Sequence, residues 1–86
     1  MVMNYSVFLG VRERMKMNLK ISYNKLWKRL IDIGWSKTKL REESGISSSS
    51  LAKLGKGENV TTDVLLKICS VLDCGIEDIM ETVKGD

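Results

Sequence analysis

Short helical segments, each broken after two or three turns, constrain this chain more than any other feature of its sequence. Between residues 22 and 83, apolar residues recur at helical spacing, and serine, threonine or glycine signals a turn every eight to twelve residues. Helices of that length are marginal in water by themselves, so several must pack together. With 86 residues the chain can form one small domain, and the pattern predicts an all-α fold.

Five helices are expected, each with a cap or stop signal and an apolar stripe. The first lies between Ser22 and Gly34, the second covers residues 37–43 after Ser36, and the third covers about residues 48–54 after Ser47. The fourth follows Thr61, and the last lies within residues 76–83. The inward side chains expected of the first helix are Tyr23, Leu26, Trp27, Leu30 and Ile31. Those expected of the last helix are Ile76, Ile79, Met80 and Val83.

The N-terminal residues follow a different pattern. Met17, Leu19 and Ile21 alternate with polar residues, which indicates a short β-strand. One strand needs a partner, for example the same strand of a second chain. Residues 1–16 are either an extension without fixed structure or the result of an early start codon. The predicted organisation is an N-terminal arm (1–21), a helical domain (22–83) and a frayed C-terminus (84–86).

Composition excludes several functions. Histidine is absent, so the side chain that most often serves as general base near neutral pH is missing. Cys69 and Cys74 supply too few ligands for a zinc site and are expected to be ordinary buried thiols. No apolar run approaches the ~20 residues of a membrane span, and no secretory signal is recognisable. We therefore expect a cytoplasmic protein without cofactor, metal or membrane contact.

Charge is distributed unevenly along the chain. Residues 1–56 carry 12 basic and four acidic side chains, a net +8, whereas residues 57–86 carry two basic and seven acidic, a net −5. These values agree with the overall net charge of +3. A strongly positive part on a small domain indicates a polyanionic partner such as nucleic acid.

The second and third predicted helices, joined by Gly45-Ile46-Ser47, fit a helix-turn-helix. The stretch from Trp35 to Leu72 resembles the Cro and lambda-repressor type of helix-turn-helix domain (XRE-like regulators). The residues that carry the resemblance are Leu40, the turn itself, Leu51, Leu54, Gly57 and the run Val64-Leu65-Leu66-Lys67-Ile68-Cys69. Cys74-Gly75-Ile76-Glu77-Asp78-Ile79 is similar to the family's short fifth helix. The resemblance implies a compact five-helix lambda-repressor-like fold with an N-terminal arm.

The same resemblance implies roles for exposed residues. The third helix would lie in the major groove, where Ser48, Ser49 and Lys53 align with base-reading positions. The residues expected to contact DNA phosphates are Lys37, Lys39, Ser47, Lys56 and Asn59. Two departures from the family pattern concern the fine geometry. Arg41 replaces a small residue where the helices cross and must point sideways, and Gly55 replaces a larger residue near the end of the third helix.

Simpler interpretations stay open beside these roles. Residues 47–50 could form a serine-rich linker, although Ile46, Leu51 and Leu54 keep helical spacing across it. The lysines of the second helix could form an ordinary solvated face, but further lysines on the same predicted side favour phosphate contact. Both tryptophans lie at stripe positions, which favours packing between helices over stacking on bases.

The prediction is therefore a small transcriptional regulator, a repressor, that binds double-stranded DNA sequence-specifically as a homodimer and has no evident small-molecule effector. The dimer surface is expected on the last helix or on residues 17–21. The alternative is an antitoxin-like interaction module that docks a partner through residues 1–21. An enzyme is not predicted because the serines have no base to activate them. RNA binding is disfavoured by the lack of surface aromatic residues.

Overall fold

The computed structural model describes residues 18–85, and the predictions for residues 1–17 lie outside this range. Within it the domain is mostly helical, with four α-helices, one 3₁₀ turn and a two-stranded sheet. In chain order the elements are β1 (Leu19–Ser22), α2 (Asn24–Ile33), α3 (Lys37–Ser44), α4 (Ser48–Gly55), α5 (Thr62–Leu72), η1 (Ile76–Asp78) and β2 (Glu81–Lys84).

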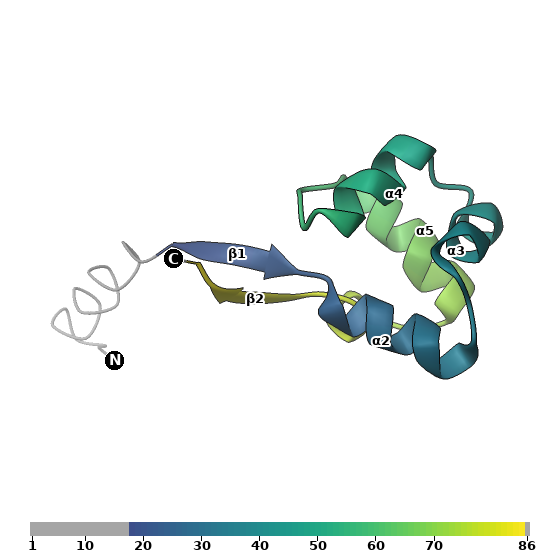
Figure 1. Cartoon of the computed structure of the whole chain (residues 1–86), viewed down its shortest axis with the longest axis horizontal. Coiled ribbons are helices and arrows are strands. Elements are labelled where there is room, and N and C mark those ends of the chain that lie inside the picture. Colours follow the sequence, from purple (N-terminus) through teal and green to yellow (C-terminus); the bar gives the residue numbers. More distant parts are fainter. Residues whose placement is uncertain (1–17, 86) are drawn as a thin grey trace, which may run out of the picture.

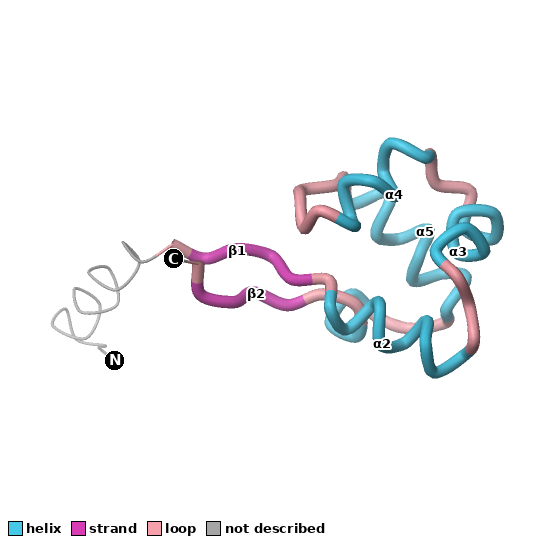
Figure 2. The backbone as a smooth tube through the Cα atoms, in the orientation of Figure 1, coloured by secondary structure: helices cyan, strands magenta, loops and turns pink. Residues whose placement is uncertain are grey.

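The helices form one body, and the two strands project from it (Figure 1). In this view α5 runs through the middle of the body between α2 and α4, while α3 packs against both α4 and α5. Figure 2 shows the strands side by side, so that the two ends of the described chain meet far from the helices. The backbone N–H of Gly85 donates to the carbonyl of Asn18 at 2.9 Å.

Side-chain caps start three of the four helices. The hydroxyls of Ser36, Ser47 and Thr61 each accept a hydrogen bond from the backbone N–H three residues later, which confirms the caps predicted for α3, α4 and α5. Ser22 was expected to cap the first helix, and that prediction is wrong. Ser22 is the last residue of β1, so α2 starts later, with Tyr23 at its N-cap and no side-chain cap.

The core is built from the predicted apolar stripes of the four described α-helices, together with residues of the turn after α3 and of the segment after η1. It consists of Tyr23, Leu26, Leu30, Leu40, Ile46, Leu54, Leu65, Ile68, Cys69 and Ile79. Ile31 was expected to face inward but is 76% exposed. At 100° per residue Ile31 lies about 80° around the helix from Tyr23, beyond the width of the buried stripe. Trp27 and Trp35 pack half-buried against the core, as expected of inter-helix residues.

The prediction of five helices is wrong at the C-terminal end. Only Ile76–Asp78 is helical there, as a 3₁₀ turn, and the chain then becomes strand β2. The spacing of Ile76 and Ile79 suits one short turn, which is enough to bury Ile79 completely. The β-branched residues Thr82 and Val83 that follow favour an extended chain when a partner strand is available.

That partner strand is β1, so the N-terminal strand is confirmed but its pairing differs from the expectation of a second chain. β1 and β2 are antiparallel, with Leu19 opposite Lys84 and Ser22 opposite Glu81. Pairing within the chain satisfies both short strands at once. The boundary expected between an arm and a domain, after residue 21, falls inside β1, and Lys84 is paired in β2.

Candidate nucleic-acid interface

The turn between α3 and α4 fixes how these helices cross. Gly45 ends α3 with φ +78°, a left-handed conformation that glycine adopts readily, and its N–H donates to the carbonyl of Arg41 at 3.0 Å. Ile46 then inserts into the core and is only 4% exposed. Ser47 starts α4 by accepting the N–H of Ser50 at 3.0 Å. Gly45 therefore ends α3, Ile46 fixes the turn to the core, and Ser47 begins α4.

Two opposite faces of α4 differ sharply in chemistry. Leu54 is 1% exposed, and the half-buried Leu51 lies one turn before it on the inner side. Ser48, Ser49 and Lys53 are all exposed. The exposed Ala52 completes a surface with small side chains along most of its length. A helix this slim fits a major groove about 12 Å wide, and its hydroxyls and ammonium can form hydrogen bonds there.

Lys37 is held at the start of α3 by an aromatic ring. Its ammonium lies 4.4 Å from the centre of the half-buried Trp27 ring on α2. This cation–π contact leaves the exposed ammonium free to approach an anion from the solvent side. The predicted role of Trp27 in helix packing thus extends to placing a cation.

Among the predicted phosphate contacts, Lys39 and Ser47 already use their polar groups in contacts with neighbouring side chains or backbone. The Lys39 ammonium lies 3.4 Å from a carboxylate oxygen of Glu43 and 5.7 Å from the centre of the Trp35 ring. The Ser47 oxygen accepts the capping N–H, and its hydroxyl donates to the Ser50 oxygen at 3.1 Å. Each must rearrange to bind phosphate directly.

Lys56 and Asn59 lie in the loop that follows α4. The loop folds back on the helix, because the carbonyl of Lys53 accepts the N–H groups of Lys56 and Glu58 at 3.1 and 2.9 Å. The Tyr23 hydroxyl donates to the Glu58 carbonyl at 2.9 Å and ties the loop to α2. Burial raises the pKa of the Tyr23 phenol, and a backbone hydrogen bond with Val60 partly offsets this. Lys56 and Asn59 remain exposed on a loop that is held at both ends.

All eight residues predicted to contact DNA are thus exposed, on three adjoining segments: the start of α3, the outer face of α4 and the following loop. Their contacts with DNA remain predictions. Lys20 on β1, which the sequence analysis did not single out, lines a hollow together with Asn59. The period-two alternation that indicated the strand could have predicted that Lys20 is exposed. It could not have predicted which residues lie near Lys20 in the folded domain.

The two cysteines lie away from these segments, at the end of α5 and just after it. Both are free thiols, Cys69 buried and Cys74 half-buried. Burial is the main cause that raises the pKa of the Cys69 thiol, and the neighbouring Cys74 thiol adds to it. A raised pKa makes a thiol a poorer nucleophile. Within residues 18–85 no group of three or more His, Cys, Asp or Glu side chains could hold a metal ion.

Comparison with known proteins decides the family. A family model for the Cro/C1-type helix-turn-helix (HTH) DNA-binding domain matches residues 25–85. The chain belongs to this family. The match confirms the resemblance found in the sequence. It covers α2 from Lys25 onward and the whole of α3, α4 and α5, and so includes the complete helix-turn-helix. Cro/C1-type domains bind DNA and are not enzymes.

The fold of this Cro/C1-type domain is also found in a solved structure. The crystal structure of the transcriptional regulator VanUg, Form II, superposes with a TM-score of 0.75 at 52% sequence identity. The match covers 78% of this chain and 89% of that one. No curated protein sequence matches this chain. Among the described helices, none has both the length and the apolar character that crossing a membrane requires.

Proposed function

We propose that the chain is a sequence-specific repressor that binds double-stranded DNA with α4 in the major groove and the start of α3 on the phosphate backbone. One observation carries this proposal: Ser48, Ser49 and Lys53 form an exposed, slim, polar face on a helix whose opposite side is anchored in the core by Leu54. Such a face has no packing role within residues 18–85. A domain seated over a promoter blocks transcription by occupancy alone.

Phosphate contacts supply most of the affinity in this proposal. Two lysines, one before α4 in the chain and one after it, supply positive charge. Lys37 is placed by the Trp27 ring, and Lys56 lies at the start of the tethered loop. Each neutralised phosphate releases condensed counterions, so binding must weaken steeply with salt. Lys39 contributes less, because Glu43 already neutralises part of its charge.

Sequence preference rests on fewer groups. Serine hydroxyls both donate and accept, and they therefore discriminate weakly between bases. Lys53 is the strongest candidate for a base contact on α4, since an ammonium suits the two acceptors of guanine. Asn59 and the sequence-dependent shape of DNA add to this selection. Because one such unit reads few base pairs, we propose that two copies bind half-sites about 34 Å apart.

The test compares three single substitutions by fluorescence anisotropy on a duplex with the preferred site and on a scrambled duplex. Lys53→Ala should weaken binding to the preferred site by about 1–3 kcal/mol, or roughly 5- to 150-fold, and relax one base position in each half-site. Lys37→Ala should weaken binding to both duplexes by a similar factor.

Lys67→Ala is the matched control, because Lys67 is an exposed lysine on α5 that is paired with Asp63 at 3.3 Å. It should bind both duplexes almost as the unsubstituted protein does. Normal binding by Lys53→Ala and Lys37→Ala on both duplexes would contradict the proposed placement of α4 and α3.

A further inference from the structure

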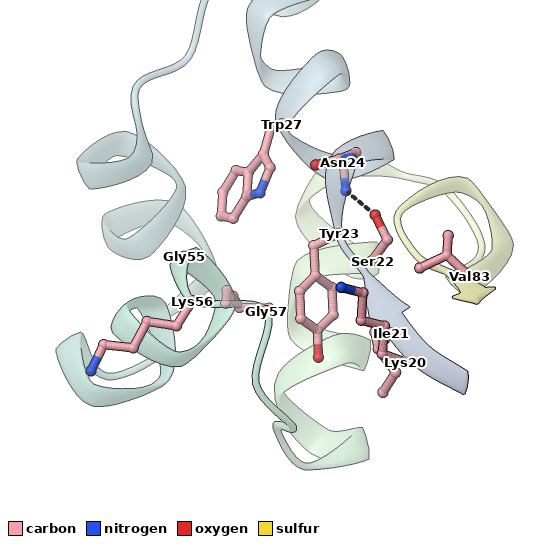
Figure 3. A pocket seen from close by; sticks show the side chains of 11 residues that line it. Lys20, Ile21, Ser22, Tyr23, Asn24, Trp27, Gly55, Lys56, Gly57 and Val83 are labelled. Carbon is pink, nitrogen blue, oxygen red and sulfur yellow. Dashed lines mark hydrogen bonds between the residues drawn. The ribbon is translucent and has the colours of Figure 1, made fainter. Parts of the chain in front are cut away.

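A hollow of about 350 Å³ opens beside the helix-turn-helix, between the strand side of the molecule and the turn after α4. Figure 3 shows its two sides: Lys20 and Ser22 belong to β1, Lys56 follows α4, and the Trp27 ring lies between them. The Lys56 side chain extends outward from the rim in this view. The hollow therefore lies on the border between the helical body and the projecting sheet.

The lining of this hollow suits an anion. It includes two lysines and no carboxylate. Neither Lys20 nor Lys56 takes part in an ion pair within residues 18–85. The Ser22 oxygen accepts the N–H of Asn24 at 3.2 Å, which leaves its hydroxyl hydrogen available to a ligand. The Lys20 ammonium and the Ser22 hydroxyl can both donate to phosphate oxygens, while Lys56 extends outward from the rim.

The hollow is also continuous with the surface proposed to bind DNA. The Trp27 ring in its wall carries the Lys37 ammonium, and Lys56 on its rim is a predicted phosphate contact. A second hollow, of about 490 Å³, is lined by Lys20 and Asn59 and also by Glu58. Lys20 therefore lies beside both loop residues expected to bind the backbone. Because Lys20 shares one hollow with Lys56 and the other with Asn59, we expect a DNA strand that contacts these two residues to approach Lys20 as well.

We propose that this hollow receives a phosphate of the DNA backbone and that Lys20, outside the helix-turn-helix, is a phosphate-contacting residue. The inference rests on the proposed function, since it extends the same surface. It gives the projecting sheet a role in binding: β2 holds β1 in place, and β1 presents Lys20 to the duplex. The contact adds affinity without sequence preference, because it reaches phosphate only.

The experiment uses the full chain with Lys20→Gln and, as matched control, Lys84→Gln. Lys84 is an exposed lysine of the same two-stranded sheet and lines neither hollow. Affinity is measured against salt on a preferred and a scrambled duplex. Lys20→Gln should weaken both by the same factor, roughly fivefold near physiological salt, and reduce the slope of log K against log salt by about 0.9 for each copy bound.

Lys20→Arg should keep the slope of the unsubstituted protein, which separates loss of charge from damage to the strand. Thermal unfolding of each variant verifies that the domain is folded. If Lys20→Gln and Lys84→Gln show equal slopes while Lys53→Ala still weakens binding, this inference is wrong and the proposed function stands. If the unsubstituted protein binds neither duplex, the proposed function fails and this inference fails with it.

Discussion

Replacing Gly45 by alanine tests whether backbone conformation alone holds the turn of the helix-turn-helix. A Cβ added at Gly45 would meet no heavy atom within 4 Å, so steric contact adds no cost. The positive φ of +78° is the only obstacle, and it costs an L-residue about 1–2 kcal/mol. Loss of backbone freedom in the unfolded chain returns about 0.4–1 kcal/mol. The net loss of unfolding free energy should be about 1 kcal/mol.

Gly55→Ala is the matched control, because a Cβ there also meets nothing within 4 Å but the residue has no positive φ. This substitution also reduces the backbone freedom of the unfolded chain but forces no residue into a left-handed conformation, so it should stabilise the domain by about 0.4–1 kcal/mol. In a domain of this size Tm should fall by about 4–8 °C for Gly45→Ala and rise by about 2–8 °C for Gly55→Ala.

The assay is thermal and urea unfolding followed by circular dichroism. The difference between the two variants isolates the cost of the left-handed conformation, about 1–2 kcal/mol, because the unfolded-state term is common to both. Gly45→Asn should fall between them, since asparagine tolerates this conformation better than alanine does. Equal stabilities for Gly45→Ala and Gly55→Ala would refute the reasoning.

Three further outcomes follow from burial. Leu54→Ala should cost about 2–5 kcal/mol in urea unfolding, whereas Leu66→Ala, at a side chain that is 55% exposed, should cost much less; equal losses would contradict the inner face assigned to α4. Burial raises the pKa of the Tyr23 phenol, so the stability that the neutral phenol contributes is complete below pH 10 and is lost as pH rises through the folded-state pKa. Tyr23→Phe should therefore lose less unfolding free energy between pH 8 and pH 11 than the unsubstituted protein does. Equal losses would exclude a contribution from the Tyr23 phenol. Iodoacetamide followed by mass spectrometry should label Cys74 before Cys69, since Cys69 is buried with a raised pKa, and equal labelling would contradict that burial.

Local signals in the sequence predicted the helical part well. Ser36, Ser47 and Thr61 start helices in the structure because a hydroxyl before an apolar stripe satisfies a free backbone N–H. Ser22 does not, since its pairing with Glu81 makes it the last residue of β1. Gly45 ends α3 for an equally local reason, its left-handed φ. Features that depend on a few neighbouring residues can therefore be predicted from one sequence.

The C-terminal segment was mispredicted because its conformation depends on a distant partner. Ile76, Ile79 and Val83 have helical spacing, but pairing with β1 makes residues 81–84 a strand. Neither segment alone shows the pairing. Pairing over a long sequence distance overrides local periodicity, and one sequence does not reveal which segments meet.

In the candidate interface, too, some features follow from local sequence and others depend on tertiary contacts. The exposure of Ser48, Ser49 and Lys53 follows from the helical period, since Leu51 and Leu54 occupy the inner side. The Lys37 ammonium lies over a ring of another helix, and Lys20 shares a hollow with Asn59, a loop residue far from it in the sequence. Such contacts depend on tertiary packing, so only the structure could provide them.

The most direct test of the central claim, that the outer face of α4 reads duplex DNA, is selection of bound fragments from a pool of random duplexes. We expect enrichment of one inverted repeat whose half-site centres are about 10 base pairs apart, because two copies related by a twofold axis would read it. Selection with Lys53→Ala should lose preference at one position in each half-site. Recovery of fragments with no shared sequence, or the same sequence unchanged for Lys53→Ala, would contradict the account.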